Sequence, residues 1–163
     1  MAHQVTDEAW RGKTGRMSQS EIAAFLTGRV LCRLSCLDDQ GWPYTVPVWF
    51  EYGDGGFYII PRERSAWAGY VQHDSRVFLC IDDLEPERKV LVMGEAQVLE
   101  EPNVGGRWVE IARRMSMRYL GEHGPDYLVP TLGEPRWLIW VRPLKITTWQ
   151  GVDWAGRYKH SRW

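Results

Sequence analysis

Apolar residues recur at every second position in several segments, and this period of two restricts the fold more than any other feature of the chain. Val30, Cys32, Leu34 and Cys36 are apolar at alternate positions, and the run Asp38-Asp39-Gln40-Gly41 follows them. Alternation predicts a half-buried strand, and a run rich in Asp and Gly predicts a tight turn. The segment is therefore expected to begin an antiparallel sheet.

Similar patterns predict further strands along the chain. The next strand is expected to carry on one face Tyr44, Val46, Val48, Phe50 and Tyr52. Pro47 within it removes a ladder donor, which indicates a sheet edge or a bulge. The turn Gly53-Asp54-Gly55-Gly56 leads to strands expected over 57–60, 77–81, 89–99, 137–141 and 145–149. Many short strands joined by turns predict a mainly β (α+β) fold, a closed or partly open antiparallel barrel of six to seven strands.

Three helices are expected between the strands. Ser18 and Glu21 have the spacing of a capping box, and Gly28 ends this short N-terminal helix, whose apolar stripe is Ile22, Phe25 and Leu26. Ser65 is expected to cap a second short helix over 65–72. A longer crossing helix is expected to open at Pro102, with apolar positions at helical spacing at Trp108, Ile111, Ala112, Met115 and Tyr119.

The other face of the longer helix is basic. It is expected to carry Arg107, Glu110, Arg113, Arg114 and Arg118. A solvated helix face explains such a run of charges. A groove for an anionic tail and a subunit contact are the two alternatives. A loop is expected to follow over 121–135.

Length and charge exclude several classes of protein. A chain of 163 residues suits one domain, and its net charge of −1 provides no basic field for nucleic acid or an anionic membrane. No apolar stretch resembles a signal peptide or reaches membrane-spanning length, so a cytoplasmic location is expected. Cys32 and Cys36 lie four residues apart on one strand, roughly 13 Å at strand rise, too far for a disulfide. Cys80 is isolated, and three free thiols suit a reducing compartment.

The expected organisation has three parts. Residues 1–16 are polar and without periodicity, and are expected to form a flexible N-terminal arm. Residues 17–150 form the barrel domain. Residues 151–163 form a tail that packs on the barrel or on a partner subunit, with Trp149 and Trp154 as a clamp.

Familiar catalytic signatures do not occur in the sequence. The four histidines, His3, His73, His123 and His160, are scattered and have no partner at metal-ligand spacing. Gly-x-Ser-x-Gly, Gly-x-Gly-x-x-Gly and P-loop patterns are also missing. No catalytic residue or metal ligand is therefore assigned.

An anion site is expected after the strand that ends near Ile60. Arg62, Arg64 and Ser65 stand at the start of the second helix, where free backbone N–H groups and the helix dipole favour negative charge. Guanidinium groups beside such a helix start suit a phosphate. The alternative interpretation is a solvated, arginine-rich turn.

The ordered set of motifs resembles the pyridoxamine 5'-phosphate oxidase-like split-barrel family, in its flavin and deazaflavin oxidoreductase branch. The resemblance covers roughly 28–150 and rests on Gly41-x-Pro43-x-x-x-Pro47, on the strand and helix of 56–82, and on Gly94-x-Ala96. It implies an antiparallel split barrel whose cofactor lies in a homodimer interface.

The resemblance also implies site residues. The cofactor ring would border Tyr44, Thr45, Val46, Pro47 and Val48. The ribityl chain would lie along Ile59, Ile60, Pro61 and Arg62, and the phosphate would meet Arg64 and Ser65. Many relatives have a lysine where this chain has Trp67, which would stack on the ring or simply pack. Lys89 and the pair Arg113 and Arg114 are the next candidates for the phosphate.

The function implied is an oxidoreductase that transfers hydride to or from a small organic substrate. FMN is the first candidate cofactor, and coenzyme F420 is the alternative, since Arg113, Arg114 and Arg118 would suit its acidic tail. The alternative function is a binding protein without turnover, which stores a flavin or binds haem or another tetrapyrrole. His73 and His123 would then be the candidate haem ligands.

Overall fold

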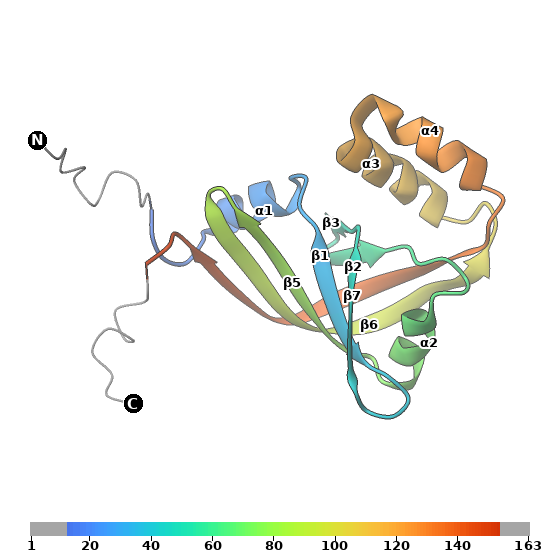
Figure 1. Ribbon diagram of the computed structural model, residues 1–163, viewed down its shortest axis with the longest axis horizontal. Coiled ribbons are helices and arrows are strands. Elements are labelled where there is room, and N and C mark those ends of the chain that lie inside the picture. The colour runs from blue at the N-terminus through green and yellow to red at the C-terminus, as the bar shows by residue number, and fades with distance from the viewer. Residues whose placement is uncertain (1–12, 154–163) are drawn as a thin grey trace, which may run out of the picture.

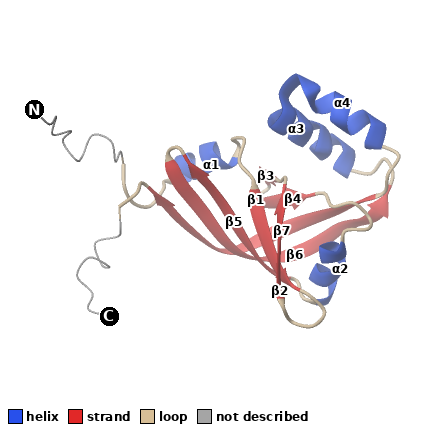
Figure 2. Ribbon diagram, viewed as in Figure 1, coloured by secondary structure: helices blue, strands red, loops and turns tan. Residues whose placement is uncertain are grey.

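In the computed structural model, the described residues 13–153 form one seven-stranded antiparallel sheet with helices against it (Figures 1 and 2). The strand order is β2-β1-β5-β6-β7-β4-β3. The strands are β1 (Cys32–Leu37), β2 (Pro43–Val48), β3 (Glu51–Gly53), β4 (Gly56–Ile59), β5 (Arg76–Leu84), β6 (Glu87–Asn103) and β7 (Arg136–Gln150). The prediction of an antiparallel split barrel of six to seven strands is confirmed, with seven strands.

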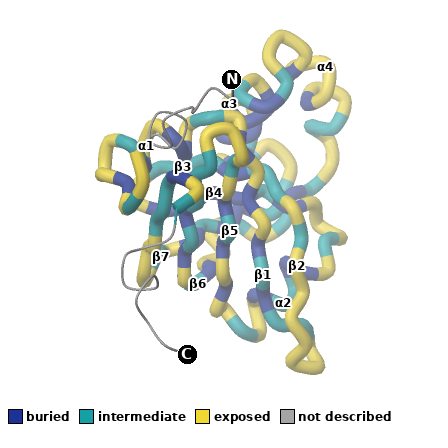
Figure 3. Tube along the Cα trace, turned by 60° about the vertical axis from the view of Figure 1, so that its left-hand side comes forward, coloured by how far each residue is buried: buried dark blue, intermediate teal, exposed yellow. Residues whose placement is uncertain are grey.

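The sheet encloses the larger of two hydrophobic cores, here called the barrel core. Alternation places Cys32, Leu34 and Cys36 of β1 on the inner face, opposite Leu79 and Ile81 of the neighbouring β5. Buried and exposed residues accordingly alternate along the strands in Figure 3. The expected hairpin between β1 and β2 is present, and Asp38 accepts hydrogen bonds from two backbone N–H groups within the turn.

The helices are α1 (Gln19–Leu26), α2 (Ala66–His73), α3 (Trp108–Leu120) and α4 (Gly124–Leu128), with 3-10 turns at Gly121–His123 and Val129–Thr131. The first helix follows the expectation: Ser18 and Glu21 form the capping box, and Ile22, Phe25 and Leu26 are buried. In Figure 1, α3 and α4 lie together at one end of the sheet, and the Arg118 side chain of α3 donates to the Leu26 carbonyl at the end of α1.

A smaller core, here called the cap core, lies beneath α3 and α4. Its buried side chains are Tyr58, Trp108, Ile111, Ala112, Met115, Tyr119, Leu128 and Leu138. The helical stripe predicted from sequence supplies five of them, and strands β4 and β7 supply Tyr58 and Leu138. The cap core is thus built across the interface between the sheet and two helices.

The single long strand expected over Tyr44–Tyr52 is wrong, because the chain leaves the sheet at Trp49 and Phe50. The segments before and after form β2 and β3, at opposite edges of the sheet. Side chains from α3 satisfy the released backbone: the Phe50 carbonyl accepts from Arg118, and the Phe50 N–H donates to the Tyr119 hydroxyl at 3.4 Å. Of the two positions expected for Pro47, a sheet edge or a bulge, the structure has the edge, because β2 ends the sheet.

Three further boundaries differ from the sequence expectation. Pro102 lies near the end of β6 and does not open the helix, which begins at Trp108. The segment 121–135 contains α4 and two 3-10 turns, where a loop was expected; prolines at early helix positions are compatible with such turns. The two strands expected over 137–149 are one strand, β7, whose pairing with β6 shifts register beside Pro143.

The described part of each terminus is attached to the sheet. Gly15 pairs with Gln150 through two backbone hydrogen bonds of 2.9 and 2.8 Å, and the Trp149 indole donates to the Asp153 carbonyl. Most of the expected N-terminal arm, and Trp154 of the expected clamp, lie outside the described residues. Cys32, Cys36 and Cys80 are free thiols. No helix within 13–153 is both long and apolar enough to cross a membrane.

Candidate functional site

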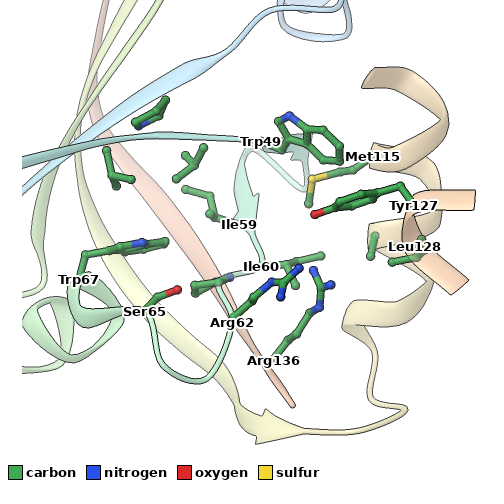
Figure 4. A pocket seen from close by; sticks show the side chains of 15 residues that line it. Trp49, Ile59, Ile60, Arg62, Ser65, Trp67, Met115, Tyr127, Leu128 and Arg136 are labelled. Carbon is green, nitrogen blue, oxygen red and sulfur yellow. The ribbon is translucent and has the colours of Figure 1, made fainter. Parts of the chain in front are cut away.

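A cavity of about 220 Å³ lies where the barrel core meets the cap core (Figure 4). One wall comes from the end of β2 and the crossing segment, a second from the end of β4 and the start of α2, and a third from α3 and α4. The lining residues are Val46, Pro47, Val48, Trp49, Ile59, Ile60, Pro61, Arg62, Ser65, Trp67, Ala112, Met115, Tyr127, Leu128 and Arg136.

One part of the wall is aromatic and apolar. Trp49 stacks on Tyr119 with ring centroids 4.7 Å apart and an interplanar angle of 9°. Tyr127 of α4 lies 5.3 Å from Trp49 at a tilt of 58°, and Met115 and Leu128 stand beside them in Figure 4. Flat, polarizable side chains of this kind suit a planar apolar ligand.

The opposite part of the wall is basic and polar. Arg62 and Arg136 form an isolated antiparallel bridge, flanked by hydrogen bonds from the Glu63 N–H to the Pro135 carbonyl and from the Trp137 N–H to the Pro61 carbonyl. This pairing aligns the two arginines on one side of the cavity, as Figure 4 shows. Ser65 stands at the N-cap of α2, where the backbone of a helix start favours anions.

The side-chain hydroxyl of Ser65 makes no capping hydrogen bond. The position of the N-cap was predicted correctly from the sequence, but the capping bond was not. Because this oxygen is not used by the helix, it is available to a group in the cavity.

Nine of the residues implied by the resemblance lie together in this cavity: Val46, Pro47, Val48, Ile59, Ile60, Pro61, Arg62, Ser65 and Trp67. Trp67 is only 6% exposed and also belongs to the barrel core, so packing accounts for most of its surface. The residues come from two segments, 46–48 and 59–67, that the fold brings to one place.

Four of the implied residues do not line the cavity. Tyr44 contacts Tyr70 edge to face, with ring centroids 5.6 Å apart, and Thr45 exchanges a hydrogen bond with Ser35. Arg64 is exposed in the turn before α2. Lys89 lies at the start of β6, where its register partners are Asp82 and Trp149.

Six lining residues were not assigned to the site from the sequence: Trp49, Ala112, Met115, Tyr127, Leu128 and Arg136. Ala112 and Met115 were expected as helix core, which the cap core bears out. Arg136 follows Gly133-Glu134-Pro135, and nothing in that local pattern indicates a binding role. Its position depends on pairing with Arg62, 74 positions earlier in the chain.

The other candidates for binding are occupied elsewhere. Arg113 pairs with Glu110 at 2.8 Å and Arg114 with Glu51 at 2.7 Å. The side chains of His73 and His123 are largely exposed, near Asp39 and Asp126, and neither lines the cavity. Within 13–153 no cluster of three or more His, Cys, Asp or Glu side chains has the geometry of a metal site.

The seven-stranded split sheet and its side cavity define a split-barrel protein. The family model for pyridoxamine 5'-phosphate oxidase matches residues 18–150. The chain therefore belongs to the pyridoxamine 5'-phosphate oxidase-like, FMN-binding split-barrel family. No curated protein matches the chain.

The names of three solved structures similar to this chain mention three different ligands: FAD, haem and F420. An FAD-binding protein from Mesorhizobium loti is 17% identical with a TM-score of 0.61, over 86% of this chain and 98% of that one. The haem storage protein HutZ from Vibrio cholerae is 17% identical with a TM-score of 0.60, over 82% and 94%. A protein named F420 reductase is 18% identical with a TM-score of 0.58, over 76% and 94%. At 17–18% sequence identity, this similarity shows that the proteins share a fold.

Proposed function

We propose that the cavity binds the flavin mononucleotide FMN, and that the protein is an oxidoreductase acting on a small organic substrate. The observation that supports this most is the composition of the cavity, in which an aromatic and apolar wall faces two arginines and a serine. FMN has a flat ring system that suits the aromatic and apolar wall, and a phosphate that suits the two arginines and the serine. The family to which the chain belongs supports the same assignment.

The residues present fit this cofactor. The Nε atom of Arg136 is buried and has no hydrogen-bond partner, so the basic end of the cavity has an unused donor for an anion. Arg62, Ser65 and Arg136 would hold the phosphate, while Ile59, Ile60 and Pro61 would border the ribityl chain. Val46, Pro47, Val48 and Trp49 would exclude water from one side of the ring. When bound, the flavin supplies the hydride chemistry.

FMN ranks ahead of coenzyme F420 for an electrostatic reason. The acidic tail of F420 would need free basic groups near the cavity, and Arg113 and Arg114 are both engaged by carboxylates. Arg118 is half-buried and donates to the carbonyls of Leu26 and Phe50. The named F420 reductase among the similar structures keeps F420 as the second candidate. Parallel titrations with both cofactors rank them, and a clear preference for F420 would reverse this order.

We further propose that two copies of the chain complete the site. A cavity of about 220 Å³ falls below the range of about 300–1,000 Å³ typical of ligand pockets, so one copy would leave much of a flavin uncovered. The outer face of the sheet is apolar in its centre, where Phe78 and Met93 lie directly opposite each other, 39% and 52% exposed. Light scattering is expected to report a dimer for the native chain and a monomer for Met93→Glu. A monomeric native chain would contradict the proposal.

A binding role without turnover, with haem as ligand, is less well supported. Haem binding is considered because one similar solved structure is named a haem storage protein. His73 and His123 do not line the cavity, so neither is placed to ligate a haem bound there. A Soret band on haem addition that disappears in His73→Ala or His123→Ala would favour this second function.

The test of the proposed function uses two arginines that are neighbours in sequence. Arg62→Ala removes a charge-assisted bond of roughly 1.5–3 kcal/mol and is expected to weaken FMN binding about ten- to hundredfold. Arg64→Ala is the matched control: Arg64 does not line the cavity, and its change is expected to leave affinity unaltered. Flavin fluorescence quenching measures both. Equal affinities in the native protein and both variants would place the phosphate elsewhere, and absence of any FMN binding to the native chain would refute the function.

A further inference from the structure

Four residues on the helical side of the cavity have no role in the cofactor assignment. They come from α3 and α4 and are here called the cap wall: Ala112, Met115, Tyr127 and Leu128. Three of them present only apolar atoms to the cavity, and Tyr127 adds a hydroxyl. The cap wall is therefore an apolar surface with a single hydrogen-bonding group.

The hydroxyl of Tyr127 forms no hydrogen bond with any residue in 13–153. Figure 4 shows this side chain extending from α4 beside Met115, with its oxygen at the end that points into the cavity. The residue is 41% exposed, so a molecule that enters from solvent can reach it. A phenol both donates and accepts, so this hydroxyl can bind a polar atom of a molecule that lies on the cap wall.

Packing fixes the place of Tyr127. Its ring lies 5.3 Å from that of Trp49, which in turn stacks on the buried ring of Tyr119. The helix that carries Tyr127 begins at Gly124, where a Cβ atom would lie only 2.8 Å from the backbone carbon of Ser116 in α3. The absence of a side chain at Gly124 therefore allows α4 to lie close against α3. Trp49 and Tyr127 together form an aromatic corner of the cavity.

The charges around the cavity favour a neutral ligand at this corner. Arg62 and Arg136 are the only charged side chains that line the described cavity, and no Asp, Glu, Lys or His is among the lining residues. A cationic ligand would have no carboxylate to pair with there, which makes its burial unfavourable. An anionic ligand would compete with the phosphate assigned to the two arginines.

We propose that Tyr127 is a specificity-determining residue, which selects neutral, planar compounds that carry a carbonyl group. The flat part of the compound would contact Trp49 and Met115, and its carbonyl oxygen would accept a hydrogen bond from the Tyr127 hydroxyl. A carbonyl conjugated to a ring is planar and only accepts, so it matches both the aromatic surface and the phenol donor. The inference rests on the proposed function for the presence of a flavin, and it adds the class of substrate.

The test compares acetophenone with ethylbenzene, which has the same ring and a similar shape but no carbonyl. Both are titrated by NMR into the full chain with oxidised FMN bound. Tyr127→Phe keeps the ring and removes the hydroxyl. It is expected to lower the preference for acetophenone about two- to tenfold and to leave the affinity for ethylbenzene unchanged. Tyr44→Phe removes a hydroxyl outside the cavity and is the matched control, expected to change neither affinity.

Two results would refute the inference directly: no binding of acetophenone to the native chain, or the same preference in Tyr127→Phe as in the native chain. Benzoate, an anion of similar shape, tests the expected neutrality of the substrate. It is expected to bind less tightly than acetophenone, and tighter binding would contradict the proposed substrate class.

FMN titrations into the same proteins separate this inference from the proposed function. Tyr127→Phe is expected to bind FMN as the native chain does. If the native chain binds no FMN, the proposed function is refuted, and the acetophenone and ethylbenzene titrations are repeated without cofactor. A preference for acetophenone that still falls in Tyr127→Phe would then support the role of Tyr127, and an unaltered preference would refute that role as well.

Discussion

The barrel core and the cap core differ in the types of side chain that form them. The barrel core is apolar apart from the indole N–H of Trp67 and the thiols of Cys32 and Cys36, and most of its side chains come from alternating strand positions, α1 and α2. The cap core is smaller and more aromatic, and two arginines border it: Arg118 contacts the rings of Phe50 and Tyr119, and Arg136 contacts Trp108. The barrel core has one such arginine, Arg88 over the Phe25 ring, whereas the cap core also contains the hydroxyl of Tyr119, whose hydrogen bonds must be satisfied.

This difference explains why the cavity lies between the two cores. Ile59 and Trp67 belong to the barrel core, while Met115 and Leu128 belong to the cap core, and all four line the cavity. Three polar or charged side chains, Arg62, Ser65 and Arg136, also line it. The boundary between the cores therefore supplies both space and charge, which a uniformly packed interior does not.

The largest expected effect tests whether the barrel core dominates stability. Leu79→Ala, at a fully buried position of β5, is expected to lower the free energy of unfolding by about 2–5 kcal/mol, because it removes buried methyl groups and leaves a void. Leu128→Ala in the cap core is the matched comparison and is expected to cost less, since its neighbourhood already opens to the cavity. Urea unfolding followed by circular dichroism measures both. A larger loss at Leu128 would reverse the proposed hierarchy.

An intermediate effect tests the polar connection between the cores. The Tyr119 hydroxyl donates to the Val30 carbonyl at 2.8 Å and accepts from Arg118 at 2.8 Å, and burial raises the pKa of Tyr119 above its ordinary value. Tyr119→Phe leaves these buried partners unsatisfied and is expected to cost about 1–3 kcal/mol. Tyr44→Phe, on the exposed edge strand, is expected to stay within about 0.5 kcal/mol. Equal losses of unfolding free energy in Tyr119→Phe and Tyr44→Phe would show that the hydrogen bonds of the Tyr119 hydroxyl do not stabilise the cap core.

The smallest expected effect lies outside both cores, at the start of α1. Hydrogen bonds from Lys13 and from the Ser18 N–H lower the pKa of Glu21 from its ordinary 4.5 to about 2. A carboxyl whose pKa is lowered by folding stabilises the native state above its unfolded pKa, and this contribution disappears as the pH falls from about 4.5 to about 2. Glu21→Gln is expected to melt slightly below the native chain at pH 7.

As the pH falls to about 2, the two melting temperatures are expected to approach each other, because about half of the native carboxyl groups are then protonated. Added salt is expected to reduce the difference at pH 7, because it screens the pairing with Lys13, which is exposed. Melting curves across this pH range provide the measurement. If the difference in melting temperature between Glu21→Gln and the native chain increases as the pH falls below 4.5, the lowered pKa of Glu21 is contradicted.

Much of the barrel was predictable because its rules act over a few residues. Alternation in Cys32–Leu37 and the capping box of Ser18 with Glu21 are local patterns, and the structure has both. The basic end of the cavity was partly predictable for the same reason, since Arg62 and Ser65 stand within one short turn and both line the cavity. Pro47 indicated an edge strand because its ring removes a backbone donor wherever it stands.

The predictions that failed depended on distant partners. The pattern from Tyr44 to Tyr52 predicts one strand, but the backbone of Phe50 donates to the Tyr119 hydroxyl and accepts from Arg118, both on α3, where the chain crosses between sheet edges. Lys89 follows a strand pattern that carries no information about which end of the barrel it occupies. The sequence separation between Lys89 and Arg62 therefore did not predict how far apart the two residues lie in the fold.

The sequence by itself determined the fold class, the edge position of β2 and one half of the basic site, because the period of apolar residues and the chemistry of turns act locally. Only the tertiary structure decided that Arg136 stands beside Arg62, that Trp49 and Tyr127 line the same cavity, and that Arg64 and Lys89 stand outside it. The physical reason is that pairing across a sheet and packing between two cores depend on residues far apart in the chain, whose mutual position no local pattern encodes.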